Sequence, residues 1–156
     1  MIQDKTEDSF KRAKDYVYKL LKFRLRSEKE IIQRLKNKNF DEPIIKKTIS
    51  YFKDLGLIDD LKFCQLWIEE RIKKPFGFYR ILRELKQRGI PQEIIDKVWQ
   101  EKSSNLDEKE LILKIIQKKL KDKSLSVSIK DKARLYSQLI RRGFNQEIVS
   151  EILDSL

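Results

Sequence analysis

The sequence predicts an all-α fold: an elongated, curved array of three tandem three-helix repeats, with about nine helices. The first observation is an internal repeat, because IIQRLKNKNFDEPIIKKTI (31–49), ILRELKQRGIPQEIIDKVW (81–99) and LYSQLIRRGFNQEIVSEIL (135–153) align without a gap. The second is that apolar residues recur at helical spacing, while no segment shows the sustained alternation of a strand. The third is a shortage of helix breakers, with 4 Gly and 3 Pro in 156 residues. Repeats of this period are typical of stacked helical units.

The first repeat is expected within residues 1–58. Residues 1–8 are polar and are predicted to form a frayed tail, after which a helical pattern begins at Phe10. Ser27 followed by Glu30 has the spacing of a capping box, in which each group satisfies a backbone N–H of the other. A second helix is therefore predicted to begin there.

Two turns complete this repeat. Asn39 is predicted to end the second helix, because asparagine tolerates the left-handed backbone of a helix terminus. Asp41 is expected to cap the third helix, and Pro43 lies in its first turn, where the missing N–H costs little. Gly56 is predicted to end that helix.

The second repeat is expected at residues 59–101. KKPFG (73–77) breaks its first helix, Gly89 ends its second, and Pro91 begins its third. The sequence thus repeats the order of helices and stops seen in the first repeat.

The third repeat is expected at residues 102–156. EKSSNLDEKE (101–110) forms a polar joint before it, and Gly143 ends its second helix. The loop DKSLSVSIKDK (122–132) is expected to be longer than its counterparts, which explains the wider spacing between the second and third copies.

Composition narrows the possible functions. The chain has 36 Lys and Arg against 25 Asp and Glu, a net charge of +11, which favours a polyanionic partner. The absence of His excludes Ser-His and Cys-His catalysis, and the single cysteine, Cys64, excludes an internal disulfide and a multi-thiolate zinc site. No signal peptide or membrane span is apparent. We expect a soluble, monomeric, cytoplasmic protein that is not an enzyme and holds no cofactor or metal.

Several residues could carry chemistry but have a simpler structural interpretation. Asp59 and Asp60 could be metal ligands or an acid/base pair, but a helix N-cap explains them better, because a carboxylate there suits the helix dipole. Cys64 lies among core-facing positions and has no histidine to activate it. Trp67 and Trp99 lie in apolar stripes and are predicted to belong to the core.

The basic residues of the second repeat are the candidate binding surface. A helical wheel of residues 78–88 places Arg80 and Arg83 opposite the apolar face. Arg71 lies near the direction of the buried residues, and two roles stay open: a charge reaching solvent at a helix end, or a partly desolvated anchor for an acidic partner. Arg141 could likewise be a contact or simply a solvated helix end. The candidate residues are Arg71, Lys73, Lys74, Arg80 and Arg83, with Arg88, Arg141 and Arg142 behind them.

Four strings, in this order, resemble the RecX family of regulators of the RecA recombinase: SEKEIIQRLKNKNF, LGLIDDLKFCQLWIEER, GFYRILRELKQRGIPQEII and LIRRGFNQEIV. The resemblance covers about residues 16–153, and its most specific part runs from Gly56 to Ile90. Asn39 stands where the family usually has Gly, and Cys64 where Ala is common.

The resemblance implies a curved row of three-helix repeats that binds along the groove of the RecA filament. It implies inhibition of the RecA ATPase, strand exchange and coprotease activities, by capping or destabilising the filament, and a role in homologous recombination, DNA repair and the SOS response. Weak, charge-driven DNA binding would follow from the net charge. The alternative is a stand-alone DNA-binding protein, since a basic helix in a three-helix unit can act like a helix-turn-helix.

Overall fold

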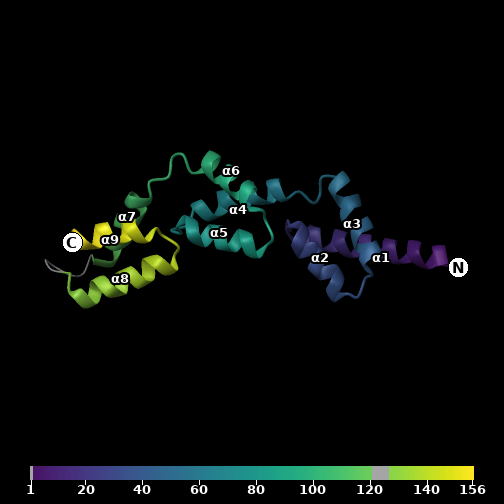
Figure 1. The fold of residues 1–156 in the computed structure, drawn as a ribbon, viewed down its shortest axis with the longest axis horizontal. Coiled ribbons are helices and arrows are strands. Elements are labelled where there is room, and N and C mark those ends of the chain that lie inside the picture. Colours follow the sequence, from purple (N-terminus) through teal and green to yellow (C-terminus); the bar gives the residue numbers. More distant parts are fainter. Residues whose placement is uncertain (1, 121–126) are drawn as a thin grey trace.

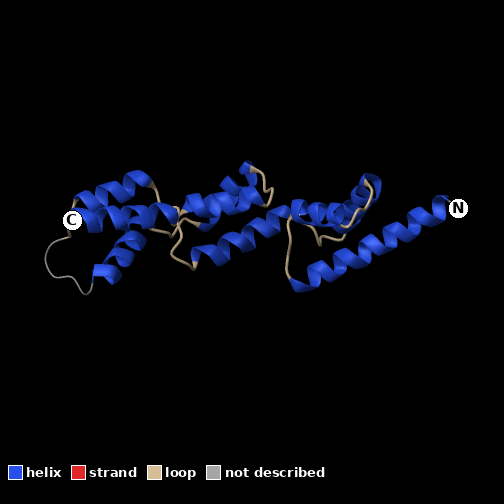
Figure 2. Cartoon of the chain, turned by 90° about the horizontal axis from the view of Figure 1, so that it is seen from below, coloured by secondary structure: helices blue, strands red, loops and turns tan. Residues whose placement is uncertain are grey.

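The computed structural model describes residues 2–120 and 127–156, and within these ranges the regular structure is entirely helical. Figure 1 shows three units following one another in an elongated row, with the two termini at opposite ends. Figure 2, seen from below, shows the same row and no strand in the described residues. The predicted all-α array of three-helix units is therefore confirmed. The helices are α1 (Ile2–Phe23), α2 (Glu28–Asn37), α3 (Glu42–Asp54), α4 (Asp60–Ile72), α5 (Phe78–Gln87), α6 (Gln92–Lys102), α7 (Glu108–Leu120), α8 (Ile129–Arg141) and α9 (Gln146–Asp154).

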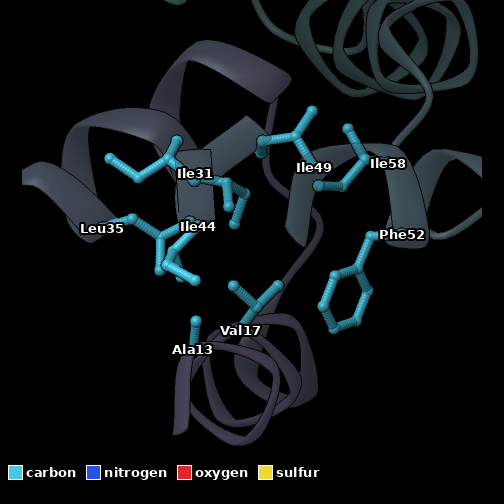
Figure 3. Close-up of a cluster of buried hydrophobic side chains, with 9 residues drawn as sticks. Ala13, Val17, Ile31, Leu35, Ile44, Ile49, Phe52 and Ile58 are labelled. Atoms are coloured by element: carbon cyan, nitrogen blue, oxygen red, sulfur yellow. The ribbon is translucent and has the colours of Figure 1, made fainter. Parts of the chain in front are cut away.

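Each unit buries its own apolar core. In the first unit, α1, α2 and α3 each contribute side chains to one cluster, and Figure 3 shows Val17, Leu35 and Phe52 within it. Separate clusters fill the middle unit and the third unit. Burying these side chains away from water is the main stabilising contribution for each unit. The expected boundaries after Ile58 and Glu101 stay predictions.

The same turn ends the second helix of every unit. Asn39, Gly89 and Gly143 occupy equivalent positions in the repeat and have φ values of 59°, 78° and 85°. This left-handed conformation is costly for most residues but accessible to glycine and asparagine. The helix stops predicted at these three residues are confirmed.

Two expectations about helix starts are wrong. Residues 2–8 are helical rather than a frayed tail, because α1 begins at Ile2 and extends the expected helix by two turns, while residue 1 lies outside the described ranges. Asp41 stands at the N-cap of α3, but its side chain accepts no capping hydrogen bond. Pro43 lies in the first turn of α3 as predicted.

The expected loop at 122–132 is only partly described, because residues 121–126 lie outside the described ranges. Its last part is helical, since α8 begins at Ile129. Ser128 caps this helix, with its hydroxyl oxygen accepting a 3.1 Å hydrogen bond from the backbone N–H of Asp131. The cap at Ser128 was not predicted from the sequence, and with it α8 begins within the expected loop.

The units are joined at equivalent positions. At the first joint, the hydroxyl of Ser27 donates a 2.7 Å hydrogen bond to the backbone carbonyl of Arg88. At the second joint, the backbone N–H of Gly77 donates a 2.9 Å hydrogen bond to the carbonyl of Arg142. In both joints, the turn after the second helix of one unit docks on the start of the second helix of the unit before it. This recurring contact places the three units in one row.

Asp60 adds a further link at the first joint. Asp59 caps α4 by accepting a 3.0 Å hydrogen bond from the N–H of Lys62, as predicted for this pair. Asp60 instead accepts a 2.9 Å hydrogen bond from the backbone N–H of Glu28, at the start of α2. One carboxylate thus serves a helix terminus of the neighbouring unit. Burial raises the pKa of Asp60 above its ordinary value.

Candidate binding surface: an arginine–aromatic ladder in the middle unit

Five side chains of the middle unit stack in alternation. The guanidinium carbon of Arg80 lies 3.7 Å from the ring centroid of Phe76, and that of Arg71 lies 5.9 Å from the same ring. On the other side, Arg71 lies 4.6 Å and Arg88 lies 3.8 Å from the ring of Trp67. We call Arg80, Phe76, Arg71, Trp67 and Arg88 the arginine ladder. Each cation–ring contact contributes about 0.5–2 kcal/mol.

Helical spacing explains how the ladder assembles. Trp67 and Arg71 are four residues apart on α4, so they share one face of that helix. Arg80 lies on α5, and Arg88 follows at its C-cap, again on one side of the helix. Phe76 belongs to the short break between α4 and α5. The break therefore supplies the ring that separates Arg71 from Arg80.

Glu84 holds the ladder together. Its carboxylate forms an ion pair with Arg71, whose Nε lies 2.7 Å from Oε2, and accepts a 3.1 Å hydrogen bond from Nε of Arg80. Nε1 of Trp67 donates to the same carboxylate at 3.2 Å, and a guanidinium nitrogen of Arg88 donates to the Glu84 backbone carbonyl at 2.8 Å. The Glu84 side chain is only 16% exposed, which strengthens these charge-assisted bonds. The Glu84 carboxylate thus orders two cations and its backbone carbonyl a third, and the ladder keeps an excess of positive charge.

Neither of the two roles left open for Arg71 describes the residue fully. Its side chain is 24% exposed, stacked on Trp67 and paired with Glu84. It is therefore neither a fully solvated charge at a helix end nor an unpaired buried anchor. The helical-wheel prediction for Arg80 is wrong in one respect. The side chain is half-buried over Phe76 rather than directed freely outward. The ring of Phe76, which lies between α4 and α5, covers the Arg80 guanidinium that α5 alone would leave exposed.

The other candidate residues differ in whether their charges form ion pairs. Lys73 pairs with Glu70 at 2.6 Å on the exposed surface. Lys74, Arg83 and Arg141 are exposed, and none of the three forms an ion pair with the described residues. The structure places Lys74 and Arg83 in the same unit as the ladder, whereas Arg141 lies in the third unit.

Arg88 and Arg142 have an additional role that depends on the backbone. Their carbonyl groups are the acceptors at the two joints between units. The guanidinium of Arg88 belongs to the ladder, while Arg142 is half-buried at the C-cap of α8. These two positions therefore contribute to the arrangement of the units whatever their side chains bind.

Residues that the sequence reading missed are Glu84 and Phe76. Glu84 could have been found, because it lies four residues from both Arg80 and Arg88 on one helix. Trp67 was assigned to the core, and it does pack against the core of the middle unit, but its ring also carries two guanidinium groups. No sequence pattern indicates that the break folds Phe76 back into this stack.

An open hollow of about 820 Å³ lies beside Arg83, an exposed arginine of the middle unit. Tyr79 and Arg83 line it from α5, and Gly143, Asn145 and Glu147 line it from the third unit. Tyr79 is 52% exposed. The hollow extends the candidate surface from the middle unit across the second joint.

The arrangement suits binding of anions. Across the described residues, no group of three or more His, Cys, Asp or Glu side chains gathers that could hold a metal ion. Burial raises the pKa of the Cys64 thiol to about 11, which keeps it protonated and unreactive near neutral pH. The rings of Trp67 and Phe76 already carry guanidinium groups, so the ladder presents N–H donors rather than bare aromatic faces.

Family models match all three units. They are described as the first, second and third three-helix domains of RecX, and they match residues 13–52, 59–98 and 107–153. Among the curated relatives, the regulatory protein RecX of Chlorobium phaeobacteroides is 37% identical over 147 residues, with 94% of each chain covered. The regulatory protein RecX of Clostridium beijerinckii is 32% identical over 152 residues, covering 94% of this chain and 68% of the relative.

Solved structures show the same fold. The crystal structure of RecX from Lactobacillus salivarius superposes with a TM-score of 0.81 over 96% of this chain and 97% of that chain, at 20% sequence identity. In the described part of this chain, every helix is too short or too polar to cross a membrane.

Proposed function

This chain belongs to the RecX family, and on that premise we propose that it is a non-enzymatic negative regulator of the RecA recombinase. It binds the filament that RecA forms on DNA and lowers the ATPase, strand-exchange and coprotease activities of that filament. The family supports a regulatory role in the context of RecA, and the direction of regulation is part of the proposal. A monomeric state and a cytoplasmic location stay predictions.

The observation that carries the proposal is the arginine ladder. Its guanidinium groups are held in place by Glu84 and by two rings, so little side-chain freedom is lost when a partner binds. The excess of positive charge suits a nucleoprotein filament, which presents phosphates and acidic side chains. The net charge of +11 adds attraction at longer range.

The row of units supports the same function. A chain of repeated units presents an extended surface, and a filament presents the same subunit at regular intervals. Three units in a row can therefore contact a partner over a longer path than one compact domain of this size. The candidate residues are concentrated in the middle unit, where such contacts would be centred.

The test reverses two exposed charges next to the ladder without touching the ladder itself. We expect the double variant Lys74→Glu, Arg83→Glu to need about tenfold more protein for half-inhibition of the DNA-dependent RecA ATPase, a change of about 1.4 kcal/mol in binding. The matched control, Lys118→Glu, Arg134→Glu, reverses two exposed charges of the third unit. Equal inhibition by both variants, with helicity intact, would remove this surface from the proposal.

The second candidate is a stand-alone DNA-binding protein, and the excess of positive charge is the observation in its favour. Salt dependence does not separate the two functions, because both contacts are charged. Affinity for bare single-stranded DNA should therefore be compared with affinity for the RecA filament on the same DNA. Equal affinities would favour the DNA-binding protein.

A further inference from the structure

The arginine ladder reaches from one joint of the row to the other. At one end, the carbonyl of Arg88 accepts the 2.7 Å hydrogen bond from Ser27 at the first joint, while the guanidinium of the same residue stacks on Trp67. At the other end, Phe76 directly precedes Gly77, whose N–H makes the backbone bond of the second joint. One network of side chains therefore has an end at each joint.

Arg80 ties the ladder to the second joint more closely. A Cβ atom added to Gly143 would lie 2.2 Å from the backbone nitrogen of Arg80, so the turn of the third unit lies directly against the backbone of α5. The backbone N–H of the neighbouring Tyr79 donates a 3.1 Å hydrogen bond to the Gly143 carbonyl. The guanidinium carbon of Arg80 at the same time lies 3.7 Å from the centroid of the Phe76 ring. A shift of this turn would therefore displace the backbone that carries a ladder residue.

The helix α5 and its residue Glu84 connect the two ends. The helix spans Phe78–Gln87, so the second joint lies at its start and the first joint at its C-cap, about 15 Å apart. Between them, the Glu84 carboxylate forms an ion pair with Arg71 at 2.7 Å and accepts a 3.1 Å hydrogen bond from Arg80. The Glu84 backbone carbonyl accepts a 2.8 Å hydrogen bond from the Arg88 guanidinium. A single residue thus contacts ladder members at both ends.

The second joint has room to change. In the described residues each unit has its own apolar core, so the arrangement of neighbouring units depends on the joints. Two hollows, of about 820 Å³ and 250 Å³, adjoin the second joint. Tyr79 and Gly143 line the larger one, and Phe76, Trp99 and Phe144 line the smaller one. Side chains beside a hollow can shift without the overlap that close packing imposes, and one wall of this space is a ladder ring.

We propose that the arginine ladder couples the two joints, so that a change at one joint alters the arrangement of the units at the other. Coupling of this kind is carried by packed side chains and hydrogen bonds that connect the two places. Glu84 is the positioning residue, because it bonds to guanidinium groups at both ends of the ladder. The three units then change their arrangement together instead of joint by joint.

The test measures two distances between nitroxide labels by pulsed electron spin resonance on the free chain. Ser50→Cys with Lys97→Cys reports on the first joint, and Lys97→Cys with Ser137→Cys reports on the second joint. The three positions are exposed and lie in the first, middle and third unit. Cys64 stays in place, because it is buried and its raised thiol pKa keeps it unreactive. RecA is absent, so the outcome is separate from that of the proposed regulation.

Each joint is then disturbed in turn. Ser27→Ala removes the side-chain donor of the first joint, and we expect it to widen the distance distribution across the second joint as well as the first. Gly77→Ala crowds the second joint and should likewise change the distribution across the first joint. Ser128→Ala is the matched control, because it removes a cap at the end of α8 that lies away from the second joint, and it should change neither distribution.

The role of Glu84 is tested by repeating both measurements in Glu84→Gln. Glu70→Gln is the control background, because Glu70 forms an exposed ion pair outside the ladder. We expect the effect on the distant joint to disappear in Glu84→Gln and to persist in Glu70→Gln. If Ser27→Ala leaves the distances across the second joint unchanged, the proposal is overturned whatever Gly77→Ala does. Distant effects that remain undiminished in Glu84→Gln would overturn it equally, because another path would then connect the joints.

Discussion

The backbone N–H of Gly77 donates a 2.9 Å hydrogen bond to the carbonyl oxygen of Arg142, and this bond joins the middle unit to the third unit. The N–H of Tyr79 donates a second bond, of 3.1 Å, to the carbonyl of Gly143. The second joint is therefore made by backbone groups at close approach. The first joint uses the side chain of Ser27 on the equivalent carbonyl, that of Arg88. Equivalent carbonyl groups in the repeat thus accept from a side-chain hydroxyl at the first joint and from a backbone N–H at the second joint.

Gly77→Ala should open the second joint. A Cβ atom at this position would lie 2.2 Å from the carbonyl oxygen of Gly143, although the backbone of Gly77 is one that alanine adopts freely. Overpacking costs about 1–3 kcal/mol, against a gain of about 0.4–1 kcal/mol from reduced freedom of the unfolded chain. We expect a net loss of about 1–2 kcal/mol in denaturant unfolding. Gln87→Ala, exposed on the same helix, is the control and should leave stability unchanged.

Ser27→Ala should weaken both α2 and the first joint. Its hydroxyl accepts from the N–H of Glu30 at 3.3 Å and donates to the Arg88 carbonyl, and the side chain is fully buried. Losing a cap costs about 1 kcal/mol, and a buried carbonyl left unpaired costs about 1–3 kcal/mol more. Ser128→Ala removes an exposed cap of α8 and should show the first loss only. A similar loss of unfolding free energy in both variants would mean that the joint bond contributes nothing.

Glu84→Gln should disorder the arginine ladder. The amide keeps the size of the side chain but replaces charge-assisted bonds to Arg71 and Arg80 with weaker ones. We expect a loss of about 1–3 kcal/mol in unfolding free energy, together with a change in tryptophan fluorescence, because Trp67 also bonds to this carboxylate. Glu70→Gln breaks the exposed pair with Lys73 and should change neither quantity. Identical results for the two variants would contradict the role given to Glu84.

Cys64 predicts a loss of stability at alkaline pH. Burial raises the pKa of its thiol from 9.0 to about 11, so the folded protein keeps the proton to a higher pH than the unfolded chain. This contribution is fully present below pH 9 and is lost as pH rises from 9 towards 11, by about 1 kcal/mol at pH 10. Unfolding should therefore be followed at pH 8 and pH 10 in the parent protein and in Cys64→Ala. The decline should be smaller in the variant, and equal declines would show that the thiol does not titrate differently on folding.

Most of the local patterns were confirmed, because their chemistry lies within a few residues. Ser27 and Glu30 form the capping box that their spacing indicates, and Gly89 and Gly143 adopt the left-handed turns expected of helix stops. The start of α1 was missed because its first residues are polar, and a helix without an apolar stripe has no periodic signal. Asp41 shows the limit of such patterns, since a residue of the right type at an N-cap need not form the capping bond.

The candidate surface was only partly predictable. The basic residues were visible as a group, but the helical wheel treats α5 alone and so directs Arg80 outward. The wheel cannot include Phe76, which comes from the break, or Trp67, which comes from another helix.

The sequence by itself determined the number of units, the order of their helices, the positions of the main stops and the family. These properties depend on apolar periodicity and on turn residues, which act over a few positions along the chain. Only the tertiary structure decided how the units meet, which cations are half-buried and which carboxylate pairs with them. Those outcomes depend on contacts such as Ser27 with Arg88 and Gly77 with Arg142, whose partners lie more than sixty residues apart. Burial and pairing of charges are properties of three-dimensional neighbourhoods, and the spacing of residues along one helix does not contain them.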